Sequence, residues 1–141
     1  HPEVVFTRED PPGSGPVAAV SAGLALTRTS VVVILAVDTP FALPHLLRLH
    51  LSPNDTALIP QDLTGKPQYL AGTYHSTALQ AALDGLGDPT NTSMRELITH
   101  LPQAKYFALT PESADYFMDL DTPEDLAAAQ ALLPPHPKVG P

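Results

Sequence analysis

Residues 31–40 read Val-Val-Val-Ile-Leu-Ala-Val-Asp-Thr-Pro. A continuous apolar run without alternation is typical of a strand covered on both faces by helices, so residues 31–37 predict the central strand of a sheet. Asp38 follows this strand directly, and Thr39-Pro40 marks a turn. The stretch therefore predicts an α/β sheet with a carboxylate at the end of its central strand.

Strands and helices are expected to alternate on either side of this stretch. Short apolar runs predict further strands at 4–6, 57–60, 68–74, 106–109 and 117–120. Helices are predicted at 16–26, 44–51 and 76–86, then through His100, and last from Pro123, with Ser76, Thr92 or Ser93, and Thr122 as caps. This order predicts a three-layer α/β fold, a mostly parallel sheet with helices on both faces. Because such sheets bind ligands at the carboxyl ends of their strands, the loops after residues 6, 37 and 120 are the candidate site.

The length and composition favour one domain. The 141 residues, 43% of them hydrophobic, can bury one core and are too few for two ordinary domains. We expect a domain over residues 1–133 and a flexible proline-rich tail over residues 134–141. The sequence has no cysteine, and its longest apolar run is too short for a bilayer span. A cytoplasmic protein without thiol chemistry is the expectation.

The charge balance excludes two classes of partner. Fifteen acidic residues against seven basic ones give a net charge of −8. Nucleic acids and anionic membranes need clustered Lys and Arg, so we expect neither as a partner. An acidic protein that handles phosphates usually needs a divalent cation between its carboxylates and the substrate, which makes Mg²⁺ the expected cofactor.

The first candidate loop, residues 10–16, reads Asp-Pro-Pro-Gly-Ser-Gly-Pro and lies between an expected strand and helix. Its glycines allow backbone N–H groups to approach a ligand, and a helix N-terminus favours anions. Pro16 suits the first helical position. The same residues are equally compatible with a stiff turn that only starts a helix.

Carboxylates follow two of the expected strands. Asp38 either caps the next helix or binds a cation, since both roles compensate its desolvation. Asp119 and Asp121 lie on the same side of an extended chain, whereas Glu124 and Asp125 suit the helix dipole. Asp38 and Asp121, coming from different strand ends, provide the arrangement that Mg²⁺ on a triphosphate needs.

Other candidates carry weaker signals. Lys66, in an expected turn, and Arg95, early in a short helix, are either phosphate ligands or solvated surface charges. The six histidines share no metal-binding spacing, which argues against zinc. Ser14 has no nearby histidine in the sequence to act as its base, so no catalytic triad is predicted.

Five stretches occur in the order of a known family and together cover almost the whole chain. They are Asp-Pro-Pro-Gly-Ser-Gly-Pro-Val-Ala-Ala at 10–19, Val-Val-Val-Ile-Leu-Ala-Val-Asp-Thr-Pro-Phe at 31–41, Gly-Lys-Pro-Gln-Tyr-Leu-Ala-Gly-Thr-Tyr at 65–74, Ser-Met-Arg-Glu-Leu at 93–97, and Asp-Leu-Asp-Thr-Pro-Glu-Asp-Leu at 119–126. Their joint occurrence resembles the molybdenum cofactor guanylyltransferases, which have a Rossmann-like nucleotide-diphospho-sugar transferase fold.

The resemblance implies transfer of GMP from GTP to molybdopterin with release of pyrophosphate. It implies that Mg²⁺ is bound by the catalytic residues Asp38 and Asp121. The nucleotide would lie beside Asp10, which would contact the guanine, and beside Gly13, Ser14, Gly15 and Pro16. The pterin would lie near Lys66, Gln68 and Asp119.

The resemblance also leaves alternatives. The family opens with a strand and a glycine-rich phosphate loop that nothing in this sequence matches, so we expect the domain to be incomplete at its N-terminus rather than an inactive descendant. A cytidylyltransferase acting on the same pterin is one alternative. The other is a non-catalytic module that holds finished cofactor or docks a molybdoenzyme or another cofactor-synthesis protein.

Overall fold

The computed structural model describes residues 4–133, and the predicted tail at 134–141 lies outside them. Four strands form one sheet in the order β1-β3-β2-β4. They are β1 (Val31–Leu35), β2 (Ala57–Gln61), β3 (Ala71–His75) and β4 (Ala104–Ala108). The α/β class is confirmed.

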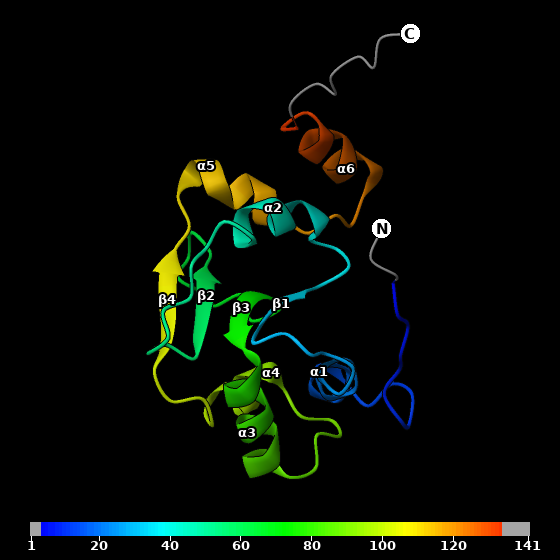
Figure 1. The fold of residues 1–141 in the computed structure, drawn as a ribbon. Helices are drawn as coiled ribbons and strands as arrows, with labels where there is room; N and C mark the ends of the chain where they lie inside the picture. Colours follow the sequence, from blue (N-terminus) through cyan, green and yellow to red (C-terminus); the bar gives the residue numbers. More distant parts are fainter. Residues whose placement is uncertain (1–3, 134–141) are drawn as a thin grey trace, which may run out of the picture.

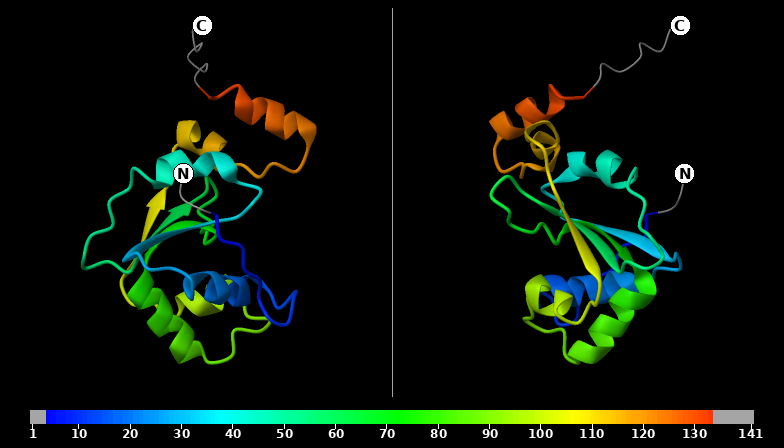
Figure 2. Two further views of the ribbon diagram at one scale, coloured as in Figure 1. Left: turned by 45° about the vertical axis from the view of Figure 1, so that its right-hand side comes forward. Right: turned by 90° about the vertical axis from the view of Figure 1, so that its left-hand side faces the viewer.

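Helices cover both faces of the sheet (Figures 1 and 2). One face carries α1 (Pro16–Leu24), α3 (Ser76–Leu86) and α4 (Met94–Ile98). The other carries η1 (Pro40–Ala42), α2 (Leu43–Leu46), α5 (Pro111–Ala114) and η2 (Asp115–Phe117). The final helix, α6 (Pro123–Gln130), lies beyond this second layer (Figure 1). The predicted three-layer arrangement is therefore present.

The sheet is mixed. β3 runs antiparallel to both of its neighbours, β1 and β2, whereas β2 and β4 are parallel. Three of the four strands thus point the same way, and β3 is reversed. The reason lies in residues 62–70, which join β2 to β3 and are too few for the helical crossover that a parallel neighbour requires.

The predicted position of residues 31–37 at the centre of the sheet is wrong for the described chain. β1 pairs with β3 on one side, and among residues 4–133 no strand pairs with its other side. Val31 is 39% exposed and Val37, beyond the end of the strand, is 97% exposed. The free side of β1 faces an apolar groove of about 400 Å³ against α1.

Four further features differ from their predictions. Residues 4–6 and 117–120 form no strand, because neither run has a neighbouring strand to pair with in the described chain. The helix predicted at 44–51 is the short α2. Ser76 is the first residue of α3 and not its cap, and its hydroxyl donates instead to the carbonyl of Thr29 at 2.7 Å.

Two apolar clusters lie on opposite faces of the sheet. The larger one joins α1, α3 and α4 to the sheet around the fully buried Tyr74, whose hydroxyl donates to the Tyr69 carbonyl at 2.7 Å. The smaller one joins η1, α2 and η2 to Ala71 of β3, through Ala42, Leu46 and Phe117. Alternate residues of β1 point to the two clusters, as a pleated strand requires.

Candidate functional site

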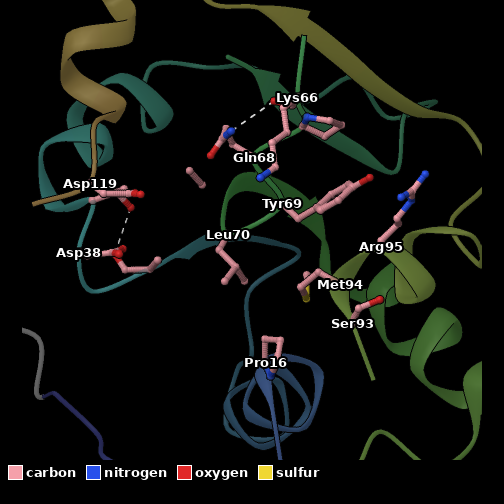
Figure 3. A pocket seen from close by; sticks show the side chains of 14 residues that line it. Pro16, Asp38, Lys66, Gln68, Tyr69, Leu70, Ser93, Met94, Arg95 and Asp119 are labelled. Carbon is pink, nitrogen blue, oxygen red and sulfur yellow. Dashed lines mark hydrogen bonds between the residues drawn. The ribbon is translucent and has the colours of Figure 1, made fainter. Parts of the chain in front are cut away.

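A pocket of about 670 Å³ opens where β1 ends, between the β2–β3 connection and the start of α4 (Figure 3). Five of the sequence-predicted site residues line it: Pro16, Asp38, Lys66, Gln68 and Asp119. The other five lie outside its lining: Asp10, Gly13, Ser14, Gly15 and Asp121. The structure therefore gathers residues from the loops after β1, β2 and η2, together with the first residue of α1.

Asp38 stands on a tight turn after β1. The amide and hydroxyl of Thr39 both donate to the Ala36 carbonyl at 3.2 Å, which fixes the turn on either side of Asp38. The residue that caps η1 is Thr39, with no side-chain capping bond. In the described chain the Asp38 carboxylate thus caps no helix, which removes one of the two roles that the sequence left open.

The second carboxylate segment is held against the first by the backbone. The Leu120 amide donates to the Asp38 carbonyl at 2.7 Å. The Asp125 carboxylate accepts from the amides of Asp121 and Thr122 at 3.1 and 3.0 Å, and the Thr122 hydroxyl accepts from the Asp125 amide at 3.1 Å. This capping box confirms Thr122 as the N-cap of α6, and it uses Asp125 for structure while Asp119 and Asp121 stay exposed.

The carboxylates are close enough to affect one another's ionisation. Desolvation raises the pKa of Asp119 above its ordinary value, and the negative charges of Asp38 and then Asp121 raise this pKa further. The ammonium group of Lys66 acts in the opposite direction. Like charges at short range disfavour ionisation, so this corner of the pocket carries excess negative potential.

The loop that carries Lys66 and Gln68 is organised by Asp62, a residue that the sequence reasoning missed. The Asp62 carboxylate accepts from the Thr64 hydroxyl at 2.6 Å and from the amides of Thr64 and Lys66 at 2.9 Å each. The Gln68 amide group donates to it at 3.3 Å. These bonds, led by that from the Thr64 hydroxyl, lower the Asp62 pKa. The Asp-x-Thr-Gly-Lys spacing of this turn is the signal that could have identified it.

The predicted nucleotide loop forms the entry to α1. Gly15 is the N-cap of α1 with φ 97°, a backbone conformation that favours glycine. Ser14 is buried, its hydroxyl donates to the Pro11 carbonyl, and its own carbonyl accepts from the Asn91 amide at 2.7 Å. These hydrogen bonds make the loop an ordered turn. Contact of Asp10 or Gly13 with a nucleotide stays a prediction.

Three further pocket residues had weak signals or none in the sequence. Tyr69, Met94 and Arg95 line the end of the pocket away from Asp38 and Asp119 (Figure 3). Tyr69 and Met94 resemble core residues in the sequence, and Arg95 was compatible with a surface charge. Only the tertiary fold brings the residues just before β3 and those at the start of α4 to the same cavity.

The donor set fits a magnesium ion. In the part of the chain that the structure describes, no group of three or more His, Asp or Glu side chains could hold a metal by itself. Mg²⁺ does not require one, because it commonly takes one or two protein carboxylates and completes its shell with phosphate and water oxygens. Desolvation and then the negative charge of Asp38 raise the Asp119 pKa, and a cation bound between the two carboxylates would offset their repulsion.

The fold and pocket define an α/β domain of the nucleotidyltransferase type, with a nucleotide-diphospho-sugar transferase fold. The chain belongs to the family of MobA-like NTP transferase domains, whose family model matches residues 1–105. Nucleotidyl transfer is the general chemistry of this family, and Asp119 and Asp121 lie beyond the matched residues. No curated protein and no solved structure matches the chain. None of the described helices has the length and apolar character needed to cross a membrane.

Proposed function

We propose that the full-length protein containing this sequence transfers GMP from GTP to molybdopterin. The observation that carries the proposal is the pocket of a nucleotidyltransferase domain in which Asp38 and Asp119 lie together while Lys66 and Arg95 supply positive charge. Carboxylates for a metal-bound triphosphate and cations for a phosphorylated acceptor are both needed for this reaction.

The nucleotide lies at the carboxylate end. Asp38, with Asp119 or Asp121, would hold Mg²⁺ for the triphosphate, and the loop before α1 would place the base. The Asp10 carboxylate suits guanine, because it can accept from both the N1–H and the N2 amino group. Lys66 binds the acceptor phosphate, and the Asp62 carboxylate together with the Gln68 side chain holds its loop in place.

The transfer itself needs positioning more than proton chemistry. An oxygen of the molybdopterin phosphate attacks the α-phosphorus of GTP, a new P–O bond forms, and the bond to the bridging oxygen breaks to release pyrophosphate. No side chain has to remove a proton, since a phosphate monoester is an anion at neutral pH. Mg²⁺, when bound, supplies neutralisation of the triphosphate charge. The residues of the pocket act by aligning the two phosphates.

The test is guanylyl transfer by the purified full-length protein. Pyrophosphate release and the dinucleotide product would be measured with molybdopterin, MgCl₂ and either GTP or CTP. We expect release with GTP that depends on both molybdopterin and magnesium. Preference for CTP would replace the guanylyl assignment by a cytidylyl one. Absence of release with both nucleotides would overturn the proposed activity.

A further inference from the structure

The two ends of the pocket differ in charge and chemical character. Figure 3 shows the Asp38 and Asp119 side chains at one end, those of Lys66 and Gln68 in the middle of the view, and those of Tyr69 and Arg95 at the other end. A ligand that spans this pocket therefore meets carboxylates, then a cation with an amide, and then an aromatic ring with a guanidinium group.

The far end is a preformed surface. Met94 and Leu97 of α4 are buried, and the Ser93 hydroxyl caps α4 by accepting from the Glu96 amide at 3.2 Å. These anchors fix the face of the helix from which Arg95 extends. The Tyr69 carbonyl accepts the buried Tyr74 hydroxyl, and the Tyr69 side chain packs against the larger apolar cluster. The two elements that carry this end of the pocket are held independently of any ligand.

The guanidinium group of Arg95 is available for a ligand. Within residues 4–133 the ion pair is between Lys105 and Asp55, and Arg95 takes part in none. A guanidinium group beside an aromatic ring and a thioether is suited to a planar heterocycle, which it contacts through stacking and through N–H donors aimed at ring oxygen and nitrogen atoms. This end is less suited to a second phosphate group, because its cation, Arg95, lies beside the apolar groups of Tyr69 and Met94.

We propose that Tyr69, Met94 and Arg95 form the acceptor-ring subsite, which binds the planar, oxygen- and nitrogen-bearing ring of a phosphorylated acceptor. Lys66 binds the phosphate of the same molecule toward the carboxylates, and Gln68, which donates to Asp62 and to the Lys66 carbonyl, orders the loop that carries Lys66. This subsite rests on the proposed function for its place in a reaction and makes Tyr69 and Arg95 the residues that determine acceptor specificity.

The test uses fluorescent pterins instead of turnover. The full-length protein and its variants would be titrated with 6-hydroxymethylpterin and with its phosphate monoester. Tyr69→Leu and Arg95→Gln should each weaken binding of both probes about tenfold or more, the loss expected for removing a stacking partner. Lys66→Gln should weaken binding of the phosphorylated probe alone. Arg48→Gln, an exposed change of the same charge outside the pocket lining, should alter neither.

Several outcomes would overturn the subsite. They are unchanged pterin affinity in both variants, equal weakening of Mg-GTP binding by Arg95→Gln, or no pterin binding by the unsubstituted protein. Thermal melting of each variant would separate loss of fold from loss of contact. Pterin binding that depends on Tyr69 and Arg95 in a protein without guanylyl transfer would support the subsite and refute the proposed function. Guanylyl transfer with an unchanged pterin KM in both variants would support the proposed function and refute the subsite.

Discussion

The backbone amide of Leu120 donates a hydrogen bond of 2.7 Å to the backbone carbonyl of Asp38. This bond joins the turn after β1 to the segment before α6, two regions far apart in the sequence. It joins the two segments that carry the Asp38 and Asp119 carboxylates of the pocket, and among the described residues η1 takes no side-chain cap from Asp38. The pairing of the two acids is thus made by main chain, and the acids themselves can be changed without removing it.

Asp38→Asn should separate stability from activity. Because Asp38 caps no helix, is exposed and repels the Asp119 carboxylate, the amide should leave the melting temperature of the ligand-free protein unchanged or slightly raised. Guanylyl transfer should fall by about a hundredfold or more, since a neutral amide is a poor ligand for a hard divalent cation. Glu112→Gln, on α5 outside the pocket, is the charge control. Near-normal transfer by Asp38→Asn would remove Asp38 from the mechanism.

Asp119→Asn should stabilise the ligand-free protein in a pH-dependent way. The folded state raises the pKa of Asp119, chiefly by desolvation and then by Asp38, so the folded protein holds this proton more tightly than the unfolded chain. Ionisation of Asp119 therefore costs stability as the pH rises through the folded pKa. The melting temperature of Asp119→Asn should exceed that of the parent at pH 7, and the gain should vanish below the ordinary value of 3.8. An Asp119 pKa below 3.8 by carboxyl NMR would contradict this.

Two glycine substitutions, one at the N-cap of α1 and one inside this helix, should have opposite effects. Gly15 has φ 97° and ψ 177°, so Gly15→Ala should destabilise the fold by about 1–3 kcal/mol through backbone strain, although a Cβ would meet no atom closer than 3.8 Å. Gly23 lies inside α1 with open space around it, and Gly23→Ala should stabilise by up to about 1 kcal/mol. Urea unfolding of both variants measures the difference. Equal effects would argue against the conformation at Gly15.

Thr73→Val should raise the free energy of unfolding. The Thr73 hydroxyl is buried on β3 without a hydrogen-bond partner in the described chain, and valine removes it with little change of shape. Relief of an unsatisfied polar group is worth about 1–3 kcal/mol. Thr56→Val is the matched comparison, because the Thr56 hydroxyl donates to the Pro102 carbonyl at 2.7 Å and its loss should destabilise. A Thr73→Val protein no more stable than Thr56→Val would contradict the assignment.

Local signals in the sequence predicted local structure well. The runs at β2 and β4, the Ser93 cap of α4 and the Thr122 cap of α6 each depend on neighbouring residues, and the structure contains all of them. The place of β1 depends instead on which other strands pair with it. An apolar run has the same pattern at a sheet centre and at an edge beside a groove, so its position was predicted wrongly.

The sequence predicted those features of the site that do not depend on how the strands are ordered in the sheet. Asp38 follows a strand directly, and its place at the strand end was predictable from that alone. Alternation put Asp119 and Asp121 on one side of the chain but could not tell which would line the pocket, because the Leu120–Asp38 backbone bond decides the orientation. Tyr69 and Met94 have the character of core residues. They line a cavity only because α4 packs beside the segment that leads into β3.

The smaller apolar cluster has a dynamic consequence for the pocket. Asp38 precedes η1 and Asp119 follows η2, so both acids are attached to the layer that buries fewer residues against the sheet. This layer should open locally at a lower free energy than the α1, α3 and α4 side, and each opening would separate the two acids. A ligand that bridges them would favour the closed form. Hydrogen exchange should therefore be faster for amides of η1, α2 and η2 than for those of α3, and Mg-GTP should slow it selectively in the first group.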